Sequence, residues 1–219
     1  MHAVLPKCKK NANSIPEELL RGCAFAHYNI MKGEEDLIDV GTTTLLGGII
    51  VPVLRSGDHR SGSFEFTFVT IGDCRAFCRK ASGGFVDLES HRANKFDPTD
   101  PGGRIGLYVE NERPDLRNIA FYITECEEDD ILFVVSDGVH DNFDPQWMGL
   151  KPKDLNLPME AWEENVKNAE EVTEKKHKWV QDLLEKMFKD EVSPQIITRR
   201  VVEHARSLTK RGREFTEQN

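Results

Sequence analysis

Apolar residues at helical spacing indicate one helix near the start of the chain. Ser14 is a common capping residue, and Pro16 suits the first turn of a helix. Apolar side chains then recur at helical spacing for about four turns. We therefore expect a helix over residues 15–32, preceded by a loose polar leader over residues 1–14.

The next part of the chain is rich in residues that favour strands. Pro52 ends one of the apolar runs, which indicates a bulge or a sheet edge. Turns at residues 72–73 and 82–84 separate the last three runs, so we expect these three to form an antiparallel meander. The runs cover residues 42–46, 49–51, 64–68, 75–79 and 85–88.

The second half of the chain changes from strands to helices. Residues 89–118 contain several Pro and Gly residues and show no periodicity, so we expect a long loop there. The elements expected after this loop are strands at residues 119–124 and 131–136, an acidic turn at residues 125–130, and amphipathic helices at residues 159–189 and 194–213.

The sharpest chemical feature follows the apolar run of residues 131–135. This run has the pattern of a strand buried on both faces, and it ends in Ser136-Asp137-Gly138. An aspartate at the end of a rigid buried strand is held in a fixed position, which suits a hard divalent cation. The alternative is that Asp137 only caps the next turn, and both interpretations stay open. Asp141 and Asp144 follow at a spacing that does not match an EF-hand.

Two further motifs are weak by themselves. Gly72-Asp73-Cys74-Arg75 has the composition of a hairpin turn, and Gly41-Thr42-Thr43-Thr44 opens a strand. The sequence contains no glycine-rich phosphate loop, no serine-hydrolase elbow and no zinc-protease motif. His140 is the one histidine near a candidate site, and a histidine in such a place is more often a structural hydrogen bonder.

The charge balance limits the classes of partner. The 219 residues include 38 Asp and Glu against 29 Lys and Arg, for a net charge of -9. Binding to nucleic acid or to an anionic membrane needs an excess of cations, so we expect neither. The sequence shows no run of 18 apolar residues and no signal peptide, and its five cysteines form no C-x-x-C pair. We therefore expect an intracellular, cytoplasmic protein.

Taken in order, the three motifs resemble those of the PP2C (PPM) family of metal-dependent protein phosphatases. That family shows G-[ST]-T-[AT], then a strand into G-D-[SC]-R, then S-D-G-[VIL]-x-D. The matching segments begin at Gly41, Gly72 and Ser136, and the resemblance covers about residues 15–215. It implies an α+β fold, a four-layer α-β-β-α sandwich of antiparallel sheets. The implied activity is Mg²⁺- or Mn²⁺-dependent hydrolysis of phosphoserine and phosphothreonine in a phosphoprotein substrate.

The resemblance also implies roles for individual residues. Asp137 looks like the metal aspartate of S-D-G, Gly138 shapes its turn, and Asp141 supports that turn. The family's metal centre activates a water that attacks phosphorus directly, so no side-chain nucleophile is needed. The hairpin motif, whose role in the family is mainly structural, matches Gly72, Asp73 and Arg75.

The sequence departs from the family pattern toward both ends. It lacks the D-G-H-G-G segment, whose aspartate bridges both metals, and it lacks the D-[NH]-x-T segment of the last strand. At most one of the main metal ligands is therefore present, and one carboxylate cannot hold two metals. We expect an incomplete sandwich without its N-terminal and C-terminal core strands, as in a fragment of an active phosphatase. The alternatives are a natural PP2C-like protein without catalysis and a site completed by a partner chain.

These departures set the expectation for function. The partial phosphatase domain spans residues 15–215, with the helices of residues 159–213 as an insertion or flanking elements and residues 216–219 as a tail. We expect the chain alone to be weakly active or inactive. The competing function is a non-catalytic regulatory or protein-binding module, with a protein partner at exposed sheet faces. Open faces and edges also predict an oligomeric or aggregation-prone chain.

Overall fold

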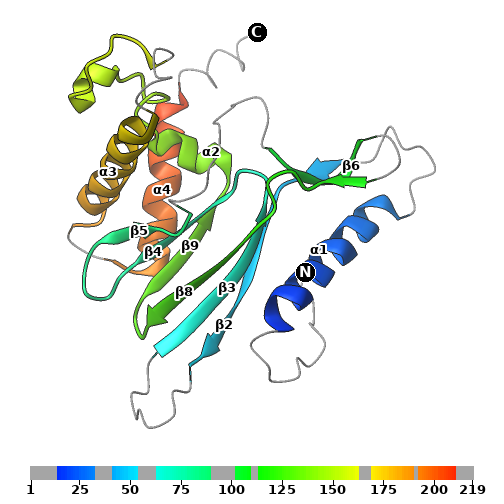
Figure 1. Cartoon of the computed structure of the whole chain (residues 1–219). Coiled ribbons are helices and arrows are strands. Elements are labelled where there is room, and N and C mark those ends of the chain that lie inside the picture. The colour runs from blue at the N-terminus through cyan, green and yellow to red at the C-terminus, as the bar shows by residue number, and fades with distance from the viewer. Residues whose placement is uncertain are drawn as a thin grey trace. The chain divides into compact units, whose positions relative to one another are not determined.

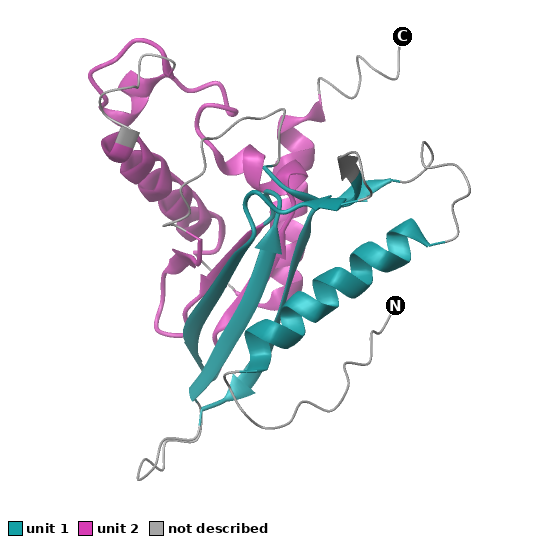
Figure 2. Cartoon of the chain, turned by 45° about the vertical axis from the view of Figure 1, so that its right-hand side comes forward, with its two compact units in different colours: residues 1–74, 91–128 teal, residues 75–90, 129–219 magenta. Residues whose placement is uncertain are grey.

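The computed structural model describes residues 14–32, 41–53, 63–89, 102–109, 113–162, 169–189 and 192–210. The expected leader, apart from Ser14, and the tail at residues 216–219 lie outside these ranges. The chain divides into two compact units, shown in teal and magenta in Figure 2. Unit 1 contains residues 1–74 and 91–128, and unit 2 contains residues 75–90 and 129–219.

The fold class is α+β, as the sequence predicts. Both units combine helices with antiparallel strands, and every strand pair within the described residues is antiparallel (Figure 1). No helix in the described ranges has the length and apolar character needed to cross a membrane.

Unit 1 is built on a three-stranded sheet with one helix against it. The strands lie in the order β2 (Leu45–Pro52), β3 (Ser63–Ile71) and β8 (Ala120–Glu127). Helix α1 (Ile15–Met31) begins where Ser14 and Pro16 predict it to begin, and it packs its apolar stripe on one face of this sheet. The buried residues of this core are Ile15, Leu19, Cys23, Val69, Ile71 and Ile105. Strand β2 lies at a sheet edge, as Pro52 indicated.

A second, smaller sheet of unit 1 corrects the prediction of a structureless loop over residues 89–118. It consists of β1 (Thr42–Thr43), β6 (Arg104–Val109) and β7 (Arg113–Asp115). Gly106 has a φ of 96° and the pairing of β6 with β7 shifts register, so the strand shows no clean alternation in the sequence. Short, irregular strands of this kind give no period-2 signal.

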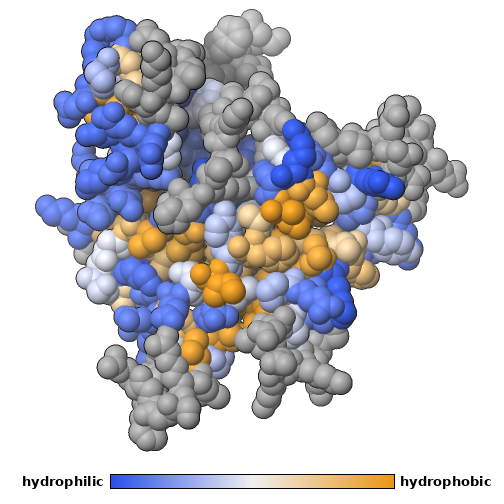
Figure 3. Space-filling model, viewed as in Figure 1, coloured by the Kyte–Doolittle hydropathy of each residue, from blue (hydrophilic) through white to orange (hydrophobic). Residues whose placement is uncertain are grey.

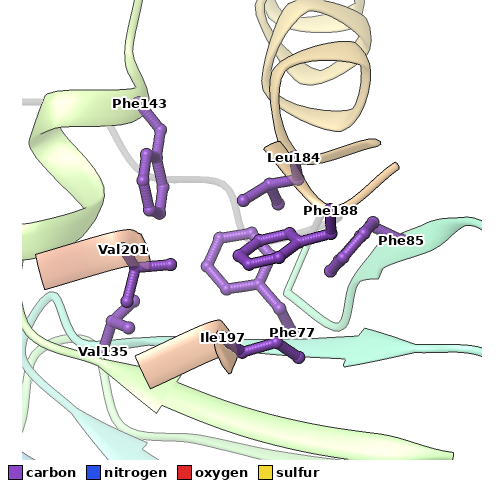
Figure 4. Close-up of a cluster of buried hydrophobic side chains, with 8 residues drawn as sticks. All are labelled: Phe77, Phe85, Val135, Phe143, Leu184, Phe188, Ile197 and Val201. Atoms are coloured by element: carbon purple, nitrogen blue, oxygen red, sulfur yellow. The ribbon is translucent and has the colours of Figure 1, made fainter. Parts of the chain in front are cut away.

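Unit 2 packs two helices against another three-stranded sheet. The strands lie in the order β5 (Phe85–Asp87), β4 (Arg75–Arg79) and β9 (Ile131–Val135). The core contains eight buried apolar side chains, drawn in Figure 4. The helical elements are α2 (Asp137–His140), η3 (Asp141–Phe143), η4 (Pro152–Leu155), α3 (Ala169–Met187) and α4 (Pro194–Leu208).

The predicted meander of residues 64–88 is correct in its second half and wrong in its first. Strands β4 and β5 form the expected antiparallel pair. Strand β3, however, pairs with β2 and β8, and β4 has β9 as its other neighbour. Residues 72–74 therefore connect strands of two different sheets instead of closing a hairpin. A turn at residues 72–73 is compatible both with a hairpin and with a connection between two sheets. The pairing is decided by β8 and β9, which come from a later part of the chain.

Two other predictions about unit 2 need correction. Strand β9 is not buried on both faces, since Val134 is 48% exposed. Residues 159–162 do not extend α3, because Trp162 instead packs beside Leu155 and Leu157 and donates its indole N–H to the Leu150 carbonyl oxygen at 2.9 Å. Pro152 opens the short helix η4, and Pro158 disfavours a helical conformation at the residue before it.

Candidate functional site

Asp137 lies at the start of α2, directly after the end of β9. Ser136 occupies the N-cap position in an extended conformation, and Asp137 is the first residue of the helix. The side chain of Asp137 is exposed, and its Oδ1 accepts a hydrogen bond from the Gly138 backbone N–H at 2.7 Å. The strand and the turn together therefore present this carboxylate to solvent in a defined orientation.

The segment after Asp137 is anchored in the core of unit 2. Phe143 at the end of η3 is fully buried, and its ring meets the Phe77 ring edge-on with centroids 6.4 Å apart (Figure 4). The ring of His204 on α4 lies tilted against the Phe143 ring, and its Nε2 lies 2.9 Å from the carbonyl oxygen of Asn142. The Asn142 side-chain amide donates to the Gly138 carbonyl oxygen at 3.0 Å. Helix α4 thus holds the turn that carries Asp137.

The three acidic side chains of this segment have different environments. Asp141 Oδ1 lies 3.2 Å from His140 Nδ1. Asp144 is paired with Lys176 of α3, whose Nζ lies 3.1 Å from each carboxylate oxygen. Among the residues that the structure describes, no cationic side chain is paired with Asp137. Asp144 is therefore neutralised, whereas Asp137 keeps its charge available to solvent.

Lys176 is the centre of a small polar cluster that sequence reasoning missed. Besides Asp144, its ammonium donates to Gln146 Oε1 at 2.9 Å and lies 4.6 Å from the centroid of the Trp162 ring. These contacts tie the segment after η3 to helix α3. A single lysine among many in an amphipathic helix carries no signal that would reveal this role.

The two weaker motifs meet in unit 1. Gly72 has a φ of 101°, and a Cβ there would lie 2.3 Å from Thr44 Cγ2, so only glycine fits. Thr44 Oγ1 lies 3.3 Å from Cys74 Sγ. The side-chain amide of Asn118 forms hydrogen bonds with both backbone groups of Gly72. Its Oδ1 accepts from the Gly72 N–H, and its Nδ2 donates to the Gly72 carbonyl oxygen, each at 2.9 Å. Asn118 was not recognised from the sequence, because a single asparagine in an aperiodic segment gives no signal.

Asp73 belongs to unit 1, whereas Arg75 of the same motif belongs to unit 2. Asp73 is half-buried, and Arg75 Nη1 lies 3.7 Å from Asp87 Oδ2 on β5. The neighbouring backbone is held by a buried glutamate, since the Ala76 N–H donates to Glu89 Oε1 at 3.0 Å. These contacts orient strand β4 within unit 2.

A buried thiol in unit 1 is not a candidate nucleophile. Cys23 of α1 is buried in the core beneath the sheet, and this burial raises the pKa of its thiol. The protonated form is a poor nucleophile, so Cys23 is a packing residue.

The described residues around Asp137 offer one suitable ligand for a divalent cation. They do not offer enough oxygen ligands for a complete two-metal centre. An exposed, oriented carboxylate oxygen is a suitable ligand for Mg²⁺ or Mn²⁺. A dinuclear site needs several such oxygens, and in the described residues Asp144 is occupied by Lys176 and Asp141 contacts His140. Any further ligands must come from outside this set.

Comparison with known proteins supports the resemblance at a coarse level. The sequence is 28% identical over 144 residues to the PP2C-like domain-containing protein CG9801 of Drosophila melanogaster. This match covers 64% of the present chain and 18% of the length of that protein. No protein-family model matches the sequence, and no solved structure matches it. The similarity thus points to a PP2C-like protein, and it carries no information on activity.

Proposed function

We propose that the chain is a PP2C-like phosphatase domain in which Asp137 is one ligand of a Mg²⁺ or Mn²⁺ centre. The observation that carries this proposal is the exposed carboxylate of Asp137 at the end of β9, in a turn anchored to the core by Phe143. Similarity to a PP2C-like protein supports the same assignment. The substrates would be phosphoserine and phosphothreonine in proteins.

The residues of the turn have distinct tasks in this proposal. Asp137 binds the cation, and the Gly138 N–H orients the carboxylate through Oδ1. Asp141 supports the turn through its contact with His140. A bound divalent cation would supply an activated water and neutralise charge on the phosphate. Because the described residues offer one free carboxylate here, the chain alone should have little or no activity.

A non-catalytic PP2C-like module is the second candidate function. The observation that favours it is the ion pair between Asp144 and Lys176, which removes an acidic side chain seven residues after Asp137 from metal binding. In such a module the turn would be retained for folding, and the exposed faces of the domain would bind a protein partner.

Hydrolysis of p-nitrophenyl phosphate separates the two functions. The chain alone should stay at background with Mn²⁺. The chain joined to a segment that carries the family's D-G-H-G-G sequence should gain Mn²⁺-dependent activity, which EDTA and Asp137→Asn abolish. Asp182→Asn is the matched control, because Asp182 is an exposed aspartate of α3 paired with Lys178.

One result of this assay would contradict the phosphatase assignment. If the joined protein is folded and stays inactive with both Mn²⁺ and Mg²⁺, the phosphatase assignment falls and the non-catalytic module takes its place.

A further inference from the structure

Helix α2 carries Asp137 but has no buried side chain of its own. It has four residues, one of which is Gly138, and such a short helix is not stable in water without support. The longer helices of unit 2 are held by their own packing. Helix α4 buries Ile197, Val201 and Ala205, and α3 has an amphipathic pattern with a largely hydrophilic outer surface in Figure 3. Helix α2 therefore depends on contacts with its neighbours.

Three hydrogen bonds connect the Asp137 carboxylate with helix α4. The Gly138 N–H donates to Asp137 Oδ1 at 2.7 Å, and the Asn142 side-chain amide donates to the Gly138 carbonyl oxygen at 3.0 Å. His204 Nε2 lies 2.9 Å from the backbone carbonyl oxygen of Asn142. Both backbone groups of Gly138 are thus engaged, and His204 supplies the contact from α4.

The backbone after η3 explains why Asn142 needs a donor from another helix. A helical carbonyl group accepts from the N–H three or four residues later. Three residues after Asn142 stands Pro145, which has no N–H, and the Gln146 N–H donates instead to Asp144 Oδ1 at 2.8 Å. A carbonyl oxygen can only accept, so His204 carries a proton on Nε2 and donates it. His204 is therefore a cap for η3.

The donor is itself held in place by the core of unit 2. The His204 ring lies tilted against the ring of Phe143, which is fully buried, and their centroids are 5.8 Å apart. Ala205, the next residue of α4, is also buried. The position of α4 consequently sets the position of η3, and η3 sets that of α2 through the Asn142 amide.

We propose that His204 is a positioning residue for the metal ligand Asp137. Through Asn142 and Gly138 it fixes the orientation of the Asp137 carboxylate and thereby raises the affinity for a divalent cation, because a pre-oriented ligand has less freedom to lose on binding. This inference rests on the proposed role of Asp137 as a metal ligand. It adds that the affinity depends on where α4 lies, so a displacement of α4 would weaken metal binding.

The first measurement is a Mg²⁺ titration of the full chain, followed by the amide NMR signals of residues 137 and 138. His204→Leu removes the donor and should raise the dissociation constant about tenfold. His204→Gln should stay within about twofold of the wild type, since the glutamine Nε2 can donate to the same carbonyl group. Asn142→Ala breaks the next link and should also raise the constant about tenfold, which provides a second variant should His204→Leu fail to fold.

The second measurement is amide hydrogen exchange in the presence of EDTA, which needs no metal. It follows the N–H groups of residues 139 and 140, which both donate to the Ser136 carbonyl oxygen at 3.0 Å. His204→Leu and Asn142→Ala should speed exchange of these two groups about tenfold, whereas His204→Gln should leave it unchanged.

The matched control is Ile197→Val. Ile197 is buried on α4 about two turns before His204, so this variant lowers the stability of the same core but keeps all three hydrogen bonds. It should bind Mg²⁺ like the wild type. Equal weakening in Ile197→Val would mean that a general loss of stability is sufficient, and it would overturn the proposal.

The two measurements distinguish a failure of this inference from a failure of the proposed function. If Mg²⁺ shifts no signal at Asp137 in the wild type, the metal assignment falls, and the exchange rates alone decide whether His204 orients the turn. If Mg²⁺ binds there, wild-type affinity in His204→Leu and Asn142→Ala would overturn the positioning role. Failure of His204→Gln to restore affinity and slow exchange would also overturn it.

Discussion

At the scale of single residues, a few polar side chains connect segments that are far apart in the sequence. Lys176 is the clearest case, because one ammonium group contacts a carboxylate, an amide oxygen and an aromatic ring. Its side chain is 19% exposed, so these contacts are only partly screened by solvent.

Replacing Lys176 by Met should therefore lower the free energy of unfolding. We expect a loss of about 1–3 kcal/mol, since Asp144 loses its partner in a partly buried place. Urea unfolding followed by circular dichroism measures the change. Lys178→Met is the control on the same helix, because Lys178 forms an exposed pair with Asp182. An unchanged midpoint for Lys176→Met would show that the cluster around Lys176 does not stabilise the fold.

Asn118 gives a second test at this scale. Its amide satisfies both backbone groups of Gly72, a residue buried at the connection after β3. Asn118→Ala leaves those groups without their partner, and we expect a loss of about 2–4 kcal/mol in urea unfolding. Asn29→Ala removes only an exposed hydrogen bond of α1 and should change stability by less than about 0.5 kcal/mol. Equal effects of the two substitutions would contradict the role given to Asn118.

At the scale of elements, the turn that carries Asp137 depends on η3 and α4. Phe143→Ala should cost about 3–5 kcal/mol, because the side chain is fully buried among aromatic residues. It should also speed amide hydrogen exchange in residues 136–142 more than in β4. Phe25→Ala, at a position 65% exposed on α1, should stay within about 0.5 kcal/mol of wild type. If exchange in the turn were unchanged, Phe143 would not be its anchor.

The spacing of apolar residues and the positions of Pro, Gly and capping residues were sufficient to predict most helices and strands, but not how the strands pair. The start of α1 and the edge position of β2 follow from Ser14, Pro16 and Pro52, since these effects are local. The assignment of β3 and β4 to different sheets depends on β8 and β9, which come some 50 residues later. Strand β6 was missed because Gly106 interrupts its alternation.

The candidate site shows the same division between local and distant information. Asp137 stands out because an apolar strand ends abruptly before it, and the structure places it in the turn after β9. Asp144 is paired with Lys176, which lies 32 residues later in the chain. Neither the segment around Asp144 nor the helix that carries Lys176 indicates this pair by its own sequence. The packing of Thr44 against Gly72 in unit 1 was not predicted, because the two residues are far apart in the sequence.

At the scale of the whole molecule, the chain consists of two compact α+β units whose sheets are antiparallel. The described residues present one exposed carboxylate, that of Asp137, at the candidate metal site. The central claim is that Asp137 binds a divalent cation.

Paramagnetic broadening by Mn²⁺ in the amide NMR spectrum tests that claim most directly, since it detects even weak binding at a single ligand. Small additions of Mn²⁺ should broaden the signals of residues 136–139 first, in the wild type and in Asp182→Asn but not in Asp137→Asn. Broadening that is centred elsewhere, or that is the same in Asp137→Asn, would contradict the assignment of Asp137 as a metal ligand.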